Sequence, residues 1–374
     1  MTFTTTEHFF LELLRVGLWE REALLSQHNC LDFGKVFKLA EEQAVSGILI
    51  QSLEKNLTKL KERPSQELLL QEIGNNLIIQ QRNIELDKAV VGLCRLLDTV
   101  NSRYIIVKGQ TLAALYGDIG YRQSGDIDFY VHPDDWEKTY QLCCDVFHIE
   151  SVETHSEKHI EWEYQDVMYE MHRMLNDFSS KKHQQYWDEI IMQESWGNPW
   201  TVSINGYDVP TLAPTYNAIY VFVHLFFHLI SEGVGLRQFI DWGVVLEKGH
   251  DDIDRHLLRK HLEGIGLLKA YSGLGTVLID YLGFSVDSCP LDINEIDHNS
   301  ARKLMENILQ SGNFGHNIRF IQSHGALHGI QQIWRRLGQI IRFGHYAPGE
   351  SWGMITKTIA WWKKKLLKGV GVVF

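Results

Sequence analysis

The chain has 374 residues, of which 44% are hydrophobic and 11% aromatic, and it carries a formal net charge of −11 at pH 7. This length allows about two or three domains of ordinary size, and the apolar content excludes a mainly disordered chain. The acidic balance disfavours tight binding to a phosphate backbone, so we expect no long nucleic acid as a partner.

The cysteines and the N-terminus favour a reduced, cytoplasmic protein. The five cysteines form no CxxC pair, which argues against a disulfide framework or a zinc ribbon. The N-terminus lacks the basic segment and cleavage site of a signal peptide. The longest apolar run, residues 218–230, contains two histidines and is shorter than the ~20 residues that a membrane-spanning helix needs.

Residues 1–100 are predicted to form a helical N-terminal region, because apolar residues recur at spacings of three and four. Ser65 follows a proline and is a good helix cap, since its hydroxyl can accept a backbone N–H bond at the helix start. No proline interrupts the segment from Ser65 to Val100. This segment is predicted to be one long helix.

Residues 101–210 are predicted to form an α+β core. The predicted elements follow the order strand, helix, strand, helix, strand, strand, at residues 104–109, 111–117, 126–131, 135–147, 159–165 and 166–174. That order indicates a small mixed sheet with helices on one face. A hairpin with Asn205 and Gly206 in its turn is expected to follow at residues 200–212.

Residues 211–374 are predicted to form a helical C-terminal domain, with helices at 216–230, 236–248, 256–271 and 301–310 and a loop at 311–316. Basic residues and tryptophans gather in the tail, residues 335–368. The tail is interpreted as a solvated helix packed by its tryptophans. A segment that contacts a membrane surface or a nucleic acid is the less favoured alternative.

Three acidic residues on two predicted strands form the candidate catalytic and metal site. Asp126 and Asp128 point to the same face, because side chains alternate along a strand. Glu170 shares a face with His172 on a later strand, and it lies beside the aspartates if the two strands pair. His172 is therefore a further candidate for binding the cofactor, and a partly buried histidine that bonds a backbone carbonyl is the alternative. Three carboxylates suit Mg²⁺ or Mn²⁺ rather than Zn²⁺. The competing acids are expected on the solvated side of the sheet, and they are Glu161, Glu163 and Asp166.

Two cations and a glycine are candidates for binding a triphosphate. Gly109 closes the first strand just before a helix, which lets a phosphate approach the backbone. Lys108 precedes it, and Arg122 lies four residues before Asp126. For both cations, a purely structural role at the strand end or in the loop is the alternative.

These residues resemble the polymerase-β nucleotidyltransferase superfamily and, more narrowly, the bacterial uncharacterised nucleotidyltransferase family. The resemblance covers most of the chain. The matching residues are Lys108-Gly109, Leu112, Tyr116, Arg122, Asp126-Ile127-Asp128, Glu170-Met171-His172, His224, His228, Leu236-Arg237, Asp241 and Gly312-Asn313-Phe314-Gly315. Gln110 departs from the superfamily pattern, in which a second small residue follows the glycine.

The resemblance implies a Mg²⁺-dependent (or Mn²⁺-dependent) enzyme that moves NMP from an NTP, with ATP expected, to a hydroxyl-bearing acceptor with release of pyrophosphate. Asp126, Asp128 and Glu170 would hold the metal, and the acceptor would be a small molecule or a protein. A non-catalytic nucleotide-binding module of the same fold is the alternative.

The C-terminal helices contribute further candidates. His224 and His228 are four residues apart and share one helix face. They are expected to line the cleft or to lie in the core, and a zinc site is less favoured because the HExxH pattern is absent. Arg237 and Asp241 have the same spacing, which allows a salt bridge, and Arg237 would touch a phosphate if it faces the cleft.

Overall fold

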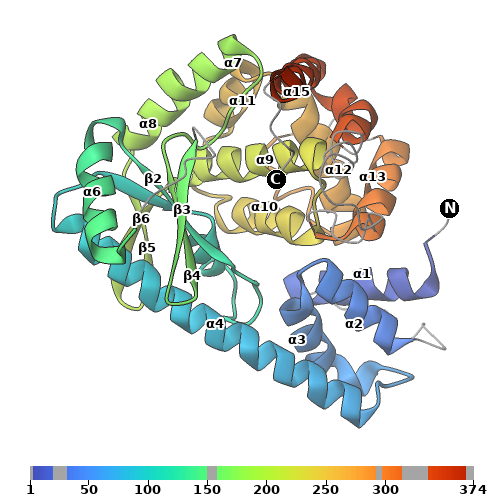
Figure 1. Ribbon diagram of the computed structural model, residues 1–374. Helices are drawn as coiled ribbons and strands as arrows, with labels where there is room; N and C mark the ends of the chain where they lie inside the picture. The colour runs from blue at the N-terminus through green and yellow to red at the C-terminus, as the bar shows by residue number, and fades with distance from the viewer. Residues whose placement is uncertain (1–2, 20–31, 150–157, 292–296, 314–335, 368–374) are drawn as a thin grey trace.

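The computed structural model describes residues 3–19, 32–149, 158–291, 297–313 and 336–367. It shows an α+β protein in which a small sheet stands between helices that precede and follow it (Figure 1). The predicted fold class is confirmed. Among the described residues, no helix is both long and apolar enough to cross a membrane.

The N-terminal helices are α1 (Thr5–Trp19), α2 (Phe33–Glu42), α3 (Ser46–Asn56), the short 3₁₀ helix η2 (Leu57–Lys59) and α4 (Gln66–Asp98). Helix α4 is the predicted long helix, and the Ser65 hydroxyl caps it by accepting the N–H of Leu68. In Figure 1, α4 runs from the N-terminal helices to the sheet. Its C-terminal half packs on the sheet through buried residues such as Val90 and Leu97.

A four-stranded mixed sheet has the order β1-β2-β4-β3. Strands β2 and β4 pair in parallel, whereas β1 with β2 and β3 with β4 are antiparallel. The elements of this region are β1 (Tyr104–Val107), α5 (Gly109–Ala113), β2 (Asp126–Val131), η3 (Pro133–Asp135), α6 (Trp136–Phe147), β3 (His159–Tyr164) and β4 (Val167–His172). This confirms the predicted order of strands and helices.

The two faces of the sheet differ. Ile127 and Phe129 of β2 are buried, as is Met171 of β4, against α4 and α6. The sequence predicted helices on this one face. The structure adds helices on the opposite face, where Tyr130 stacks on Trp196. The acidic side chains of β2 and β4 therefore lie inside the molecule rather than on an open surface.

The segment after β4 contains α7 (Lys181–Tyr186), a π-helical turn η4 (Trp187–Ile191), α8 (Met192–Gly197), β5 (Trp200–Ile204) and β6 (Tyr207–Thr211). Strands β5 and β6 form the predicted hairpin. Asn205 and Gly206 both have positive φ angles, 50° and 74°, as a type I′ turn requires.

The C-terminal helices are α9 (Pro214–Ser231), α10 (Leu236–Lys248), α11 (Arg255–Gly264), α12 (Leu268–Leu282), α13 (His298–Ser311), η6 (Gly344–Tyr346) and α15 (Pro348–Leu367). The prediction of one helix over 256–271 is wrong, because Gly266 adopts a φ of +70° and separates α11 from α12. The predicted loop at 311–316 begins one residue later, since Ser311 ends α13. Residues 314–316 and the side chains of 361–368 lie outside the described residues.

Candidate active site

The three predicted acids meet on two neighbouring strands. Parallel pairing of β2 with β4 places Asp128 directly opposite Glu170. One carboxylate oxygen from each of Asp126, Asp128 and Glu170 lies within 4.8 Å of the other two. Asp128 is buried, and the other two side chains are half-buried. The predicted convergence of these acids is therefore present.

Lys108 lies inside this acidic cluster. Its Nζ is 3.0 Å from Oδ2 of Asp128, and only 15% of its side chain is exposed. The backbone at Lys108 has a φ of 55°, and Gly109 follows with a φ of 41°. A Cβ on Gly109 would stand 3.1 Å from the carbonyl oxygen of Asp126, so the close approach of β2 favours glycine there. This turn directs the ammonium group toward the acids.

The electrostatics of the two aspartates differ. Burial would raise the pKa of Asp128, but the Lys108 ammonium and the His172 hydrogen bond outweigh it and hold that pKa well below its usual range. The pKa of Asp126 is instead raised, first by burial and then by the negative charge of Asp128. The cluster thus carries more negative charge than its own cations neutralise, which favours an additional cation.

His172 bridges two of the acids. Its Nε2 lies 2.8 Å from Oδ1 of Asp128 and 3.4 Å from Oε2 of Glu170. Burial would lower the pKa of this imidazole, but its hydrogen bonds to the two carboxylates raise that pKa. We infer that His172 orients Asp128 and Glu170 relative to each other.

Arg122 makes a different contact from the one that its spacing suggested. Its Nε and Nη2 donate to the two carboxylate oxygens of Asp241 at 2.7 and 3.0 Å, and both side chains are buried. The hydroxyl of Tyr116 donates to the same carboxylate at 2.9 Å. The carboxylate of Asp241, whose spacing allows a pair with Arg237 on its own helix, is thus bound by Arg122 from the loop before β2.

Arg237 borders the cavity and donates from Nη1 to the carbonyl oxygen of Gln123 at 2.6 Å. Burial and then the charge of Arg122 lower the pKa of this guanidinium. Gln110 points away from the acids, because its side chain donates to Asp87 and to the carbonyl of Asn83 on α4. The departure of Gln110 from the superfamily pattern thus serves the packing of α5 on α4.

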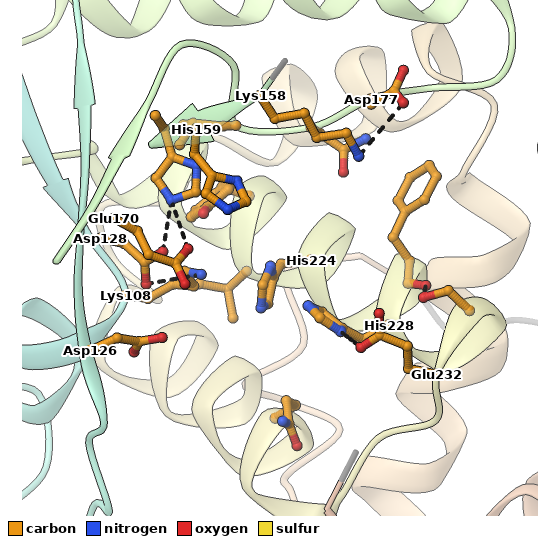
Figure 2. Close-up of a pocket in the computed structure, with 18 of the residues that line it drawn as sticks. Lys108, Asp126, Asp128, Lys158, His159, Glu170, Asp177, His224, His228 and Glu232 are labelled. Atoms are coloured by element: carbon orange, nitrogen blue, oxygen red, sulfur yellow. Dashed lines mark hydrogen bonds and ion pairs between the residues drawn. The ribbon is translucent and has the colours of Figure 1, made fainter. Parts of the chain in front are cut away.

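A cavity of about 820 Å³ extends from the acids to the C-terminal helices. This size falls within the range that small-molecule sites occupy. In Figure 2, Asp126, Asp128 and Glu170 lie at one end, His228 and Glu232 at the other, and His224 between them. The expectation that both histidines line the cleft is confirmed.

Two side chains of helix α9, His224 and Tyr220, line the cavity beside the acids. Burial, followed by the charges of Lys108 and His228, lowers the pKa of His224 well below its ordinary value. Burial also favours the neutral form of Tyr220 and therefore raises its pKa. Near neutral pH, both groups are uncharged. Sequence reasoning missed Tyr220, which is one helical turn before His224 and therefore on the same face of α9.

The three competing acids do not enter the cavity. Glu161, Glu163 and Asp166 are exposed, as their positions on β3 and in the following turn predicted. The group of Asp126, Asp128 and Glu170 offers carboxylate oxygens held close together, which is the chemistry that Mg²⁺ and Mn²⁺ prefer. These residues therefore fit a hard divalent cation.

A mixed sheet that presents converging carboxylates to a cavity is the arrangement expected of a nucleotidyltransferase. Residues 29–282 match the family described as "Uncharacterised nucleotidyltransferase", and the chain belongs to this family. No curated protein matches the chain. An antigenic nucleotidyltransferase-like protein from Paracoccidioides brasiliensis is 16% identical, with 54% of this chain and 93% of that one covered and a TM-score of 0.31.

Proposed function

We propose that this protein transfers NMP from an NTP, with ATP expected, to the hydroxyl group of an acceptor. In the reaction, the acceptor oxygen forms a bond to the α-phosphorus while the bond from that phosphorus to the pyrophosphate oxygen breaks. The acceptor proton leaves, and pyrophosphate is released. The observation that supports this most directly is the meeting of three carboxylates from β2 and β4 at one end of the cavity.

Asp126, Asp128 and Glu170 would hold Mg²⁺ or Mn²⁺ in this reaction. The bound cation would neutralise charge that develops on the attacking and leaving oxygens. Glu170 is half-buried beside the cavity, and we assign to it the acceptance of the acceptor proton. His172 would keep Asp128 and Glu170 in register through its two contacts.

The cations of the site would bind the triphosphate. Lys108 would exchange its contact with Asp128 for a phosphate oxygen once a divalent ion neutralises that carboxylate. Gly109 would allow the phosphate to approach the backbone. Arg237 would add a second charge at the cavity wall. Arg122 would contribute its positive charge but no bidentate hydrogen bond to the phosphate, because two of its guanidinium nitrogens already donate to Asp241.

The acceptor would occupy the part of the cavity between His224 and the last helices. This part is lined by Phe227, Ser231, Glu232 and Asp177, so that an apolar ring and several hydrogen-bonding groups face the same space. A small polyhydroxylated molecule or a protein side chain fits such a lining. The family membership supports a nucleotide substrate and leaves the acceptor open.

A transfer assay tests this function. Wild type, Asp128→Asn and Glu163→Gln are incubated with α-³²P-labelled NTPs, Mg²⁺ and a panel of hydroxyl-bearing acceptors. Loss of a metal ligand removes several kcal/mol of transition-state stabilisation, so Asp128→Asn should lower label transfer at least about 10³-fold. Glu163 is exposed outside the cavity, and its substitution should leave the rate unchanged. Transfer that survives Asp128→Asn would reject the mechanism.

The alternative is a nucleotide-binding module without catalysis. Its signature would be wild-type protein that binds the NTP and transfers no label to any acceptor. The same panel, combined with a binding measurement on the unlabelled nucleotide, separates the two functions.

A further inference from the structure

Two histidines and one of the acids form a second group of possible metal ligands on the sheet. His159 begins β3 and lies directly opposite His172 of β4 in the antiparallel register. Glu170 is two residues before His172 and points to the same side. One ligand atom from each of these three side chains lies within 4.8 Å of the other two. All three side chains line the cavity.

The distances suit a single ion. Nε2 of His172 is 3.4 Å from Oε2 of Glu170. Two ligand atoms at ~2.1 Å from one tetrahedral ion are themselves roughly 3.4 Å apart. The rings of His159 and His172 have centroids 5.2 Å apart and are tilted by 51°, and one ring nitrogen of each lies within 4.8 Å of the other. Antiparallel pairing of the strands holds the two imidazoles together without any long-range rearrangement.

The chemistry of this group differs from that of the three carboxylates. Imidazole nitrogen favours borderline transition-metal ions, whereas Mg²⁺ favours oxygen. A set of two histidines and one carboxylate leaves at least one coordination position for another ligand, and here that position faces the cavity.

We propose that His159, Glu170 and His172 form a second metal site, selective for a borderline dication of the Zn²⁺ or Co²⁺ type. Glu170 belongs to both groups and would lie between the two ions. With this second ion bound, His172 exchanges its contact with Asp128 for the metal, and Asp128 remains a ligand of the first ion. The site goes beyond the proposed transfer reaction and requires no step of it.

Metal titrations on the full chain test this site. Co²⁺ binding is followed by visible absorption, which responds to nitrogen ligands, and Zn²⁺ binding by competition with bound Co²⁺. His159→Gln should weaken Co²⁺ and Zn²⁺ binding at least about tenfold, since loss of even an outer-shell partner of a metal ligand costs that much. Mg²⁺ binding should not change in this variant. Asp126→Asn should show the reverse, with weakened Mg²⁺ binding and an unchanged Co²⁺ spectrum.

Two control variants separate the site from general effects. Glu161 lies 3.8 Å from His159 but is exposed, and Glu161→Gln should bind Co²⁺ as wild type does. His256 is an exposed histidine on α11, and His256→Gln should also behave as wild type. Co²⁺ affinity that is unchanged in His159→Gln, or lowered equally in the controls, would overturn the site. These results are independent of label transfer, so the proposed function can fail while this site stands.

Discussion

Two buried charge groups lie along the same cavity, and they differ in balance. In the first, three carboxylates from β2 and β4 face one ammonium group and one imidazole. In the second, the guanidinium of Arg122 meets the single carboxylate of Asp241, with two donating nitrogens and two accepting oxygens. The first group has an excess of negative charge, whereas the second is neutral as a pair.

This difference separates a binding site from a structural contact. An isolated buried charge is costly. A buried ion pair with matched hydrogen bonds therefore needs no further ion, whereas a cluster with excess negative charge is stabilised by an additional cation. Arg122 and Asp241 also join distant parts of the chain, because the loop before β2 contacts helix α10 through them. We infer that the balanced pair, Arg122 and Asp241, holds helix α10 in place against the sheet. The unbalanced cluster, formed by the three carboxylates, then faces a cavity wall whose position is fixed.

The largest expected effect is on stability and comes from breaking the balanced pair. Arg122→Met leaves the Asp241 carboxylate buried without its guanidinium partner, which should lower the free energy of unfolding by about 3–5 kcal/mol. Urea denaturation followed by circular dichroism measures the change. Arg259→Met is the control, since the ion pair of this arginine with Glu263 is exposed and 3.9 Å long, and its loss should change stability by less than ~0.5 kcal/mol. A loss below ~1 kcal/mol for Arg122→Met would show that the pair does not hold the wall.

The second prediction concerns the unbalanced cluster. Mg²⁺ or Mn²⁺ at about a hundred times its dissociation constant should raise the free energy of unfolding by ~2.7 kcal/mol, because only the folded protein assembles the three carboxylates. Thermal unfolding with MgCl₂, compared with NaCl at equal ionic strength, measures this. Asp128→Asn should abolish the shift, and Arg237→Met, outside the carboxylate set, should retain it. An equal shift in Asp128→Asn would place the ion elsewhere.

The sheet side of the site could be predicted from the sequence because strand geometry has a simple period. Alternation places Asp126 and Asp128 on one face, and the same rule places Glu170 beside His172. Only the pairing of β2 with β4 had to be assumed, and the structure contains it. The alternation of side chains, applied once to each strand, was therefore sufficient to predict that the acids converge.

The partner of Arg122 could not be predicted in the same way, because Asp241 is 119 residues away and no local period connects them. The role of Gln110 is similarly set by α4, which lies against α5 only after folding. The pairing of His159 with His172 was also not predictable from a turn motif, because Gln165 and Asp166 lack the Asn-Gly or Asp-Gly pattern of a two-residue turn. Only the structure shows their positive φ angles of 50° and 59°, and counting outward from that turn gives the register.

The smallest expected effect is the pH dependence of stability that the Asp126 carboxylate causes in the metal-free protein. Burial and the charge of Asp128 raise the pKa of Asp126, so its ionised form destabilises the metal-free fold. This destabilisation is present above the folded-state pKa and disappears as pH falls below the ordinary value of 3.8. Asp126→Asn should therefore stabilise the metal-free protein at pH 7 by up to about 1 kcal/mol, the scale of one charge interaction near a surface.

Urea midpoints of wild type, Asp126→Asn and Glu163→Gln between pH 4 and pH 7 measure this difference. The advantage of Asp126→Asn should shrink toward acid pH, and Glu163→Gln, which removes an exposed acid, should match wild type throughout. Saturating Mg²⁺ should reverse the order, because wild type then gains the binding free energy that the variant has lost. An asparagine variant that is less stable than wild type without metal would mean that Asp126 is held by its cations as firmly as Asp241 is held by Arg122.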